Sequence, residues 1–579
     1  MEEAYKFFDS PTYAPQRQYE ALRAYFYEGL SASEVAQRFG YSENSLYCFA
    51  SDFKKQLAEK TAEKKFFAQL SIGRPKTRQE HKYDQMIIAL RKKYLSVQDI
   101  KTILDTQMSG ISETYIYKLL KREGFARLPR RNKQAKIEAV SQSRIDAPTA
   151  SLLKMDEEVF STSNVGILCF LPYIVKSGIE KAIKNSTFPE TITIPRINSI
   201  LSFLALKLSN IRRYTVDDLW CMDRGCGLFA GLNVLPKAAW FSSYSHRVTR
   251  EMNISFLKEL QKLWQQQGLL SDTANLDFVA IPYWGETDQL ENNWSGTRHR
   301  ALSSILAAIA QDPDSGLITY GDTTIRHDNE ADVAVEFLDF YKRSGNKDLK
   351  YLVFDSKFTT YENLSKLDDN AVKFITIRRR GQKIVDELSA LPSSDWKKVR
   401  VKASNKIRRL NVSEKILFLK GYNKKIRQLA ITGNGKIKPA LIITNDFDLV
   451  AKDIVKKYAQ RWLVEKGISE QTHFFHLNKV SSSMVIKVDF DLTMTILAHN
   501  LYRLLANDLQ GYEHNTANTL YEKFIYNNGS VEIKDGNICL TMKKKRNLPE
   551  LLTATQKFQY IKLRWLKNFS LEIKAASNT

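Results

Sequence analysis

The sequence has 579 residues, with 87 lysines and arginines against 64 aspartates and glutamates, a formal net charge of +23. A chain of this length is expected to form several domains, and such a cationic surplus favours a polyanionic partner. The five cysteines form no CxxC pair, which disfavours a structural zinc site and favours reduced thiols. No apolar run approaches the roughly 18–20 residues that cross a bilayer, and the N-terminus lacks signal-peptide features. We therefore expect a cytoplasmic protein without a membrane partner.

Residues 1–70 predict a helix-turn-helix unit. Helical spacing of apolar side chains over residues 16–28 is followed by a glycine, and Ser31 and Glu34 have the spacing of a capping box. Another glycine ends the second helix, and a serine can cap a third helix, which in this motif enters a DNA major groove. The predicted DNA contacts are Ser42, Asn44 and Tyr47.

Residues 71–140 predict a second unit of the same form, with a basic linker. Helical spacing over residues 77–94 is followed by helices that Ser96 and Ser112 can cap. One helical triplet is a weak signal because many three-helix domains bind only each other, but two in tandem on a cationic chain favour DNA binding. The small, basic, extended linker suits a minor groove. The predicted contacts are Arg74 in the linker and Thr114, Tyr117 and Lys121 on the last helix.

Residues 141–270 predict a helical domain without identifiable chemistry. A glycine-rich segment at residues 225–236 lacks the lysine and the spacing of a phosphate-binding P-loop, so we interpret it as a packing device.

From residue 271 onward the pattern changes to alternating strands and helices. This alternation predicts a mixed α/β core covered on both faces, formed by residues 271–380 and 440–510. Residues 511–579 form a separate C-terminal region.

A basic, β-rich insertion is predicted at residues 381–439. From Arg378 to Lys438 there are 18 Lys/Arg and 4 Asp/Glu, so +14 of the +23 lies in this stretch. Basic and apolar residues alternate there, which favours a folded, positively charged surface that binds phosphates. The alternative is a solvated face that only keeps the chain soluble. The predicted DNA contacts are Arg400, Lys402, Arg408 and Arg409.

Three carboxylates are candidates for metal binding. Asp277 lies inside an apolar strand-like run, Asp355 ends another, and Glu465 follows on a predicted helix. An aspartate on a buried strand is costly unless it is paired or metal-bound. Mg²⁺ prefers oxygen ligands, and two such ions can activate the attacking oxygen of a phosphodiester reaction and stabilise the leaving one. We therefore expect two Mg²⁺ ions, with Mn²⁺ as a possible substitute. Asp322, at the end of another apolar run, competes with these candidates.

The helix that carries Glu465 has a distinctive spacing. Tyr458, Arg461 and Glu465 follow one another as Tyr-x2-Arg-x3-Glu, which puts them on one helix face. Taken alone, Tyr458 could be a core residue and Arg461 an ion-pair partner of Glu465. Together with the two strand aspartates, the spacing resembles the DDE transposases of bacterial insertion sequences, in the branch with this signature helix. The resemblance implies an RNase-H-like core, an arginine that positions DNA and a tyrosine that supports the site.

The sequence departs from the family pattern after Glu465. Thr472 stands where the family has a lysine, and Lys466 or Lys479 could replace that lysine. Gly467 is expected to interrupt the helix, and Glu470 is an alternative metal ligand.

The resemblance implies a transposase that cleaves and joins DNA with a metal ion. Its partners would be double-stranded DNA, both the terminal inverted repeats of its element and target DNA. It would act as a homodimer assembled on DNA, associated with the nucleoid. Two alternatives stay open. One is a DNA-binding regulator or domesticated transposase without catalysis, and the other is a metal-dependent nuclease without strand transfer.

Overall fold

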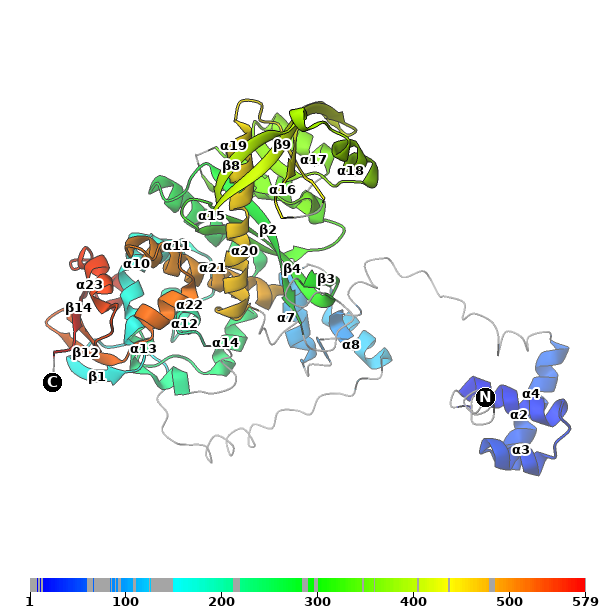
Figure 1. Ribbon diagram of the computed structural model, residues 1–579. Helices are drawn as coiled ribbons and strands as arrows, with labels where there is room; N and C mark the ends of the chain where they lie inside the picture. Colours follow the sequence, from blue (N-terminus) through cyan, green and yellow to red (C-terminus); the bar gives the residue numbers. More distant parts are fainter. Residues whose placement is uncertain are drawn as a thin grey trace. The chain divides into compact units, whose positions relative to one another are not determined.

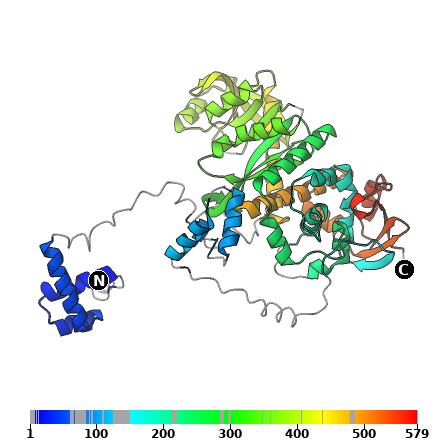
Figure 2. The ribbon, with the colours of Figure 1, turned by 180° about the vertical axis from the view of Figure 1, so that it is seen from behind.

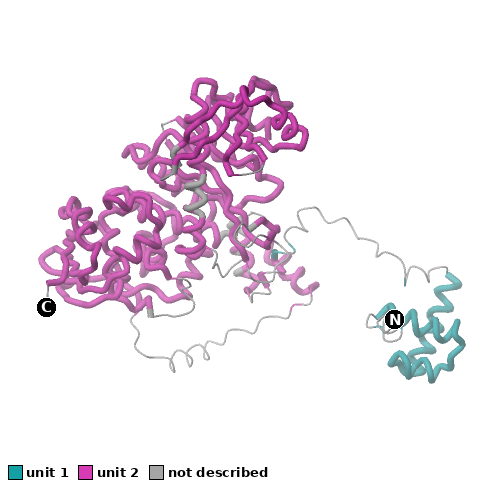
Figure 3. Tube along the Cα trace, in the orientation of Figure 1, with its two compact units in different colours: residues 1–86 teal, residues 87–579 magenta. Residues whose placement is uncertain are grey.

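The chain combines helices and sheets in two compact units, residues 1–86 and 87–579, which are coloured separately in Figure 3. Each unit is considered by itself. The computed structural model describes residues 14–59, 95–107, 111–123, 149–211, 219–283, 290–295, 300–345, 348–358, 360–403, 406–435, 438–477 and 485–577, together with a few isolated residues outside these ranges.

The first unit contains three short helices around a small apolar core. They are α2 (Ala14–Phe26), α3 (Ala32–Phe39) and α4 (Glu43–Ala58). Buried Val35 and Leu46, from α3 and α4, pack with alanines of α2. The structure therefore confirms three helices where the sequence predicted them.

Local capping fixes where these helices begin. Ser31 and Glu34 form the predicted capping box, with the Glu34 carboxylate accepting from the Ser31 backbone N–H at 2.9 Å. Gly40 ends α3 in the left-handed conformation (φ 69°), which a residue without Cβ adopts without strain. The Ser42 side chain then accepts from the Ser45 backbone N–H and starts α4. Both predicted caps are confirmed.

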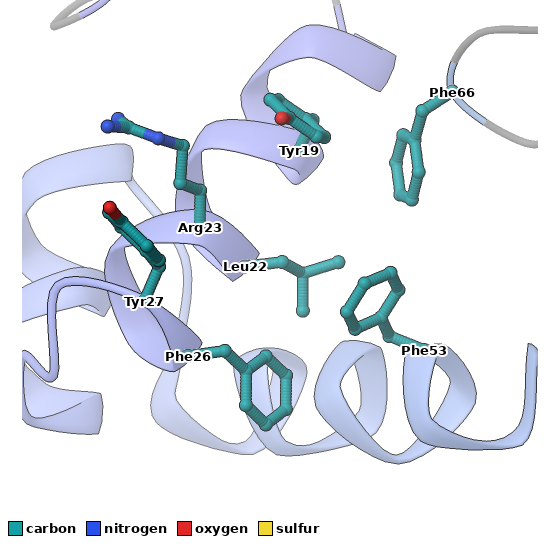
Figure 4. Close-up of a pocket in the computed structure, with 7 residues that line it drawn as sticks. All are labelled: Tyr19, Leu22, Arg23, Phe26, Tyr27, Phe53 and Phe66. Carbon is teal, nitrogen blue, oxygen red and sulfur yellow. The ribbon is translucent and has the colours of Figure 1, made fainter. Parts of the chain in front are cut away.

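An aromatic pocket of about 450 Å³ lies beside α2 and α4 in this unit (Figure 4). Its one charged side chain, Arg23, is paired with Glu20 and Glu28. The pocket contains no carboxylate or histidine, so it offers no metal ligand. Its lining residues are Tyr19, Leu22, Arg23, Phe26, Tyr27, Phe53 and Phe66.

The second unit includes two described helices of the predicted second DNA-binding segment. These are α7 (Val97–Gln107) and α8 (Glu113–Arg122), and Ser112 caps α8 by accepting from the Tyr115 backbone N–H. The linker with Arg74 and most of residues 77–94 lie outside the described residues.

Residues 149–266 are largely helical, as predicted, and they pack together with the C-terminal part of the chain. The long helix α21 (Val485–Asp508) contacts α10, α12 and α15 and also strand β5. Figures 1 and 2 show these helices gathered around α21. The helices are α10 (Leu171–Lys176), α11 (Ile179–Asn185), α12 (Arg196–Leu208), α13 (Arg224–Ala230), α14 (Ala238–Ser245), α15 (Arg250–Gln266), α22 (Ala517–Leu520) and α23 (Leu548–Gln556).

A small sheet joins the start of this helical region to the C-terminal region. Strand β1 (Glu158–Thr162) pairs antiparallel with β12 (Gly529–Lys534), which continues to β13 (Asn537–Met542) and β14 (Ser570–Ala575). Residues 511–579 therefore share a sheet with a strand more than 350 residues earlier, a long-range pairing that the sequence pattern did not indicate.

Ten described strands form the large sheet of the second unit. Their order is β3-β4-β2-β6-β7-β11-β10-β9-β8, and β5 pairs with β4. Strands β2, β6 and β7 run parallel, and β4 is antiparallel to β2. The strands are β2 (Thr273–Pro282), β3 (Asn292–Ser295), β4 (Arg300–Gln311), β5 (Ile318–Ile325), β6 (Tyr351–Phe354), β7 (Lys373–Ile377), β8 (Lys397–Ala403), β9 (Lys406–Leu419), β10 (Tyr422–Thr432) and β11 (Ala440–Thr444).

The basic segment continues this sheet. After the short helix α18 (Gln382–Ser389), strands β8, β9 and β10 form an antiparallel set that joins the core through β11, which is antiparallel to β7. The predicted β-rich character is confirmed, and the hydrogen bonds of the ladder fix the register between the basic strands and the core strands.

Helices cover both faces of the sheet. On β7, Phe374 packs against Tyr422 with ring centroids 5.9 Å apart, close to helix α17 (Tyr361–Asp369). Its neighbour Ile375 lies in a cluster with Ile454 of helix α19 (Ala451–Gln460). Successive strand residues point to opposite faces, so α17 and α19 lie on opposite sides of the sheet. Helix α16 (Val333–Ser344) contacts both α15 and α17.

The signature helix differs from the prediction at Gly467. Two helices meet at Arg461, α19 before it and α20 (Trp462–His473) after it, and α20 continues through Gly467. The predicted interruption at Gly467 is therefore wrong. A Cβ at this position would lie 3.4 Å from Gln311 Nε2 and 3.7 Å from His499 Cε1, so the glycine allows α20 to pack closely on β4 and α21.

In the described part of the chain, no helix is both long enough and apolar enough to cross a membrane.

Candidate active site

The parallel pairing of β2 with β6 brings two predicted carboxylates together. Thr273 pairs with Tyr351 and Asn275 with Val353. The same offset carries Asp277 to the position beside Asp355, the first residue after β6. Residues in register on neighbouring strands share a face, and the strands lie about 4.8 Å apart. The backbone therefore holds the two carboxylates as neighbours at the C-terminal end of β6.

Arg461 binds the first of these carboxylates. Its Nη1 lies 2.6 Å from Asp277 Oδ2, and both side chains are largely buried, with exposed fractions of 9% and 14%. The backbone N–H of Phe278 donates to Asp277 Oδ1 at 2.9 Å. The sequence had left Glu465 open as the ion-pair partner of Arg461, and the structure places Asp277 there.

Asp355 lies in the turn that follows β6. It is partly buried, and its Oδ1 accepts from the Ser356 backbone N–H at 2.5 Å. Phe358 in this turn stacks on Phe278 with ring centroids 3.7 Å apart and planes only 4° apart. This stack fixes the Asp355 turn against the strand that carries Asp277. The sequence analysis missed it, although both residues lie within three positions of a candidate carboxylate.

Tyr458 lies next to Arg461 at the same site. The guanidinium carbon of Arg461 is 5.6 Å from the centre of the Tyr458 ring. Burial raises the pKa of Tyr458 to about 12, Arg461 opposes this shift, and the charge of Asp355 adds to it. The phenol is neutral at physiological pH, as an unperturbed tyrosine also is, and its proton is available for a hydrogen bond.

Glu465 is on α20, four residues after Arg461. Residues four apart in a helix lie on the same side, one turn from each other. Its backbone therefore follows Arg461 along the helix that contacts β2. The Glu465 side chain lies outside the described residues.

Of the two competing carboxylates, Asp322 is hydrogen-bonded elsewhere, whereas Glu470 Oε2 has no hydrogen-bond partner among the described residues. Asp322 on β5 is 2.6 Å from Arg250 Nη2 and also accepts from the Tyr320 hydroxyl at 3.1 Å. Glu470 Oε2 lies 3.5 Å from His499 Nδ1 on α21. At 3.6 residues per turn, Glu470 is about 140° around the helix from Glu465. Neither side chain contacts Asp277 or Asp355 in the interactions of the described residues.

The predicted contacts on the basic strands are exposed at one end of the sheet. Arg400 on β8 pairs directly with Arg409 on β9, and Arg408 is also exposed. The side chain of Lys402 lies outside the described residues. Following the registers across the sheet brings Asp355 level with Glu414 on β9. Arg409 is five residues from Glu414 along β9, or about 16 Å at strand spacing. It lies in the direction in which β6 ends, beyond the level of Asp355.

The predicted contacts on the small helices are exposed where they are described. Asn44 and Tyr47 are exposed on α4, and Ser42 uses its hydroxyl as the cap. On α8 the exposed residues are Thr114, Tyr117 and Lys121.

Comparison with known proteins agrees with this geometry. Residues 284–501 match the family model described as the transposase DDE domain. The matched segment contains Asp355 and the helix of Tyr458, Arg461 and Glu465, and it begins seven residues after Asp277. The match confirms that the chain resembles DDE transposases.

Other comparisons are more distant. No curated protein matches the sequence. Among solved structures, the chain is similar to the piggyBac transposase synaptic complex with hairpin DNA, at 11% sequence identity and a TM-score of 0.33. That similarity covers 65% of this chain and 83% of the other.

Proposed function

We propose that this chain is a transposase of the insertion-sequence type, which binds the ends of its element and catalyses metal-dependent DNA cleavage and strand transfer. The observation that supports this most directly is the register of β2 with β6, whose offset, continued by two residues, brings Asp277 beside Asp355, in a chain that matches the transposase DDE domain. On this proposal β5, β4, β2, β6 and β7 form an RNase-H-like core.

The residues at this site fit magnesium. Asp277, Asp355 and Glu465 would supply carboxylate oxygens, the ligand type that Mg²⁺ prefers, and Mn²⁺ could replace it. Asp277 and Asp355 bring two negative charges close together, where like charges are destabilising, and Arg461 supplies one positive charge against them. Two bound ions would supply the charge that activates the attacking oxygen and stabilises the leaving one.

The surrounding residues position this site. The stack of Phe278 on Phe358 holds the Asp355 turn against β2, which keeps the two carboxylates at a fixed spacing. Tyr458 offers a neutral hydroxyl donor, and burial raises its pKa to about 12. Arg461, at the junction of α19 and α20, brings its guanidinium to the same place, and a guanidinium can bind phosphate oxygens in a bidentate manner.

DNA recognition is assigned to other parts of the chain. We propose that α3 with α4, and α7 with α8, belong to helix-turn-helix units that bind the terminal repeats through the exposed residues of α4 and α8. The exposed arginines at the end of β8 and β9 would bind the DNA backbone beyond the edge of the sheet that carries Asp355. Assembly of two copies on DNA would allow both ends of the element to be processed together.

A joining assay tests this function against a nuclease without strand transfer. The full chain is incubated with Mg²⁺, a labelled DNA that carries the element end, and an unlabelled target plasmid. We expect label released at the end of the element and label covalently joined to the plasmid, and neither product with EDTA. Cleavage without joined plasmid would establish the nuclease alternative, and binding without cleavage would establish the regulator.

A further inference from the structure

The ion pair between Arg461 and Asp277 lies where the proposed function places a metal ion. Both Asp277 oxygens have partners, because Oδ1 accepts from the Phe278 N–H and Oδ2 accepts from Arg461 at 2.6 Å. The pairing of β2 with β6 ends at Asn275 and Val353, and the same offset continued by two residues brings Asp355 beside Asp277. A cation that coordinates Asp277 Oδ2 must therefore compete with the Arg461 guanidinium.

The position of Arg461 makes it a built-in counter-ion. Its backbone lies at the junction of α19 and α20, with its N–H donating to Tyr458 O at 3.1 Å, and the residue is only 7% exposed. Lys457, one helical turn earlier, donates to Thr273 Oγ1 at 3.3 Å on the same strand as Asp277. The helix therefore directs two successive cationic side chains at this face of β2, and a charged hydrogen bond here is strong because water is largely excluded.

We infer that Arg461 is the resident counter-ion of the metal-free site and competes with the metal for Asp277. This inference rests on the proposed function, because it takes Asp277 as a metal ligand. Metal binding displaces the guanidinium from Oδ2, and the displaced guanidinium is available for a DNA phosphate, which it recognises by charge and by paired N–H donors. Arg461 thereby links metal binding to DNA binding.

The linkage has a definite sign. A DNA phosphate that binds Arg461 removes the competitor, so DNA raises the affinity of the site for metal. By thermodynamic reciprocity, metal raises the affinity for DNA by the same factor. In the free protein the arginine weakens metal binding at Asp277, so the site binds the metal most tightly when DNA is present.

The test measures Mn²⁺ binding to the full chain by electron paramagnetic resonance of the free ion, with and without element-end DNA. For wild type we expect weak binding without DNA and tighter binding with it. In Arg461→Gln we expect Mn²⁺ binding without DNA to be about tenfold tighter or more, since the lost contact is a charged hydrogen bond. DNA should then add little to the Mn²⁺ affinity. Arg564→Gln, an exposed arginine in the C-terminal region, is the matched control and should behave as wild type.

Other outcomes separate this inference from the proposed function. Unchanged or weaker Mn²⁺ binding in Arg461→Gln, with binding still lost in Asp277→Asn, would overturn the counter-ion role and leave the metal site intact. Mn²⁺ binding that is unaffected by Asp277→Asn would overturn the metal site itself. If Arg461→Gln does not fold, wild type still tests the inference, because an Mn²⁺ affinity that element-end DNA does not change would overturn it.

Discussion

Two arginines each bind an aspartate on the large sheet, in different settings. Arg250 on α15 binds Asp322 on β5 at 2.6 Å and Asp489 on α21 at 2.8 Å. Arg461 binds Asp277 on β2 at 2.6 Å, and a second carboxylate, Asp355, directly follows the neighbouring strand β6. The contact distances are alike, so distance alone does not distinguish a structural ion pair from a candidate active site.

The difference lies in what else satisfies the carboxylates. Asp489 also accepts from Asn253 and from Thr323, and Asp322 accepts from Tyr320. Burial raises the pKa of Asp489, and the charge of Arg250 opposes this. The network joins two helices to β5 and is closed by protein groups. At the ion pair of Arg461 with Asp277, a second carboxylate, that of Asp355, lies close by at the end of β6. Two neighbouring carboxylates of this kind are what a metal site needs.

Breaking the closed network should have the largest effect on stability. Arg250→Met leaves two buried carboxylates without their cation, and we expect it to destabilise the second unit by roughly 3–5 kcal/mol. Arg461→Met should cost clearly less, because it leaves one carboxylate without its cation and not two, and the Asp277 side chain is 14% exposed against 5% for Asp322 and 3% for Asp489. Chemical unfolding of the two variants, followed by circular dichroism, measures the difference. Equal losses would remove the distinction between the two ion pairs.

The exposed arginines of β8 and β9 extend the comparison to basic residues outside the ion pairs of Arg250 and Arg461. Replacing Arg400, Lys402, Arg408 and Arg409 with Gln should leave stability nearly unchanged. It should weaken binding to element-end and random DNA alike, because each lost phosphate contact lowers the slope of log affinity against log salt by roughly 0.9. A salt titration of this quadruple variant gives the slope. A slope equal to that of wild type would mean that this surface only keeps the protein soluble.

Much of the fold could be predicted from local pattern. Capping by Ser31, Ser42 and Ser112 depends on residues three positions apart, and the structure has each cap. The strands that carry or precede the two aspartates also follow from short apolar runs. These features could be predicted because each is determined by residues only a few positions apart in the sequence.

The partners of the carboxylates could not be predicted in the same way. Arg461 is 184 residues from Asp277, and Arg250 is 72 residues from Asp322. Before the fold is known, Asp277 and Asp322 are both acidic residues in apolar runs. The continuation of α20 through Gly467 was also missed, because glycine often ends a helix, whereas here it fits against Gln311 and His499.

The most direct test of the central claim is cleavage of element-end DNA by single carboxylate variants of the full chain with Mg²⁺. Asp277→Asn, Asp355→Asn and Glu465→Gln should each abolish cleavage and still bind the DNA nearly as wild type, because each removes a metal ligand and no phosphate contact. Asp535→Asn, in the exposed turn between β12 and β13, should cleave as wild type does. Wild-type cleavage by any of the three variants would contradict the assignment of that carboxylate, and full activity in both aspartate variants would contradict the account of the site.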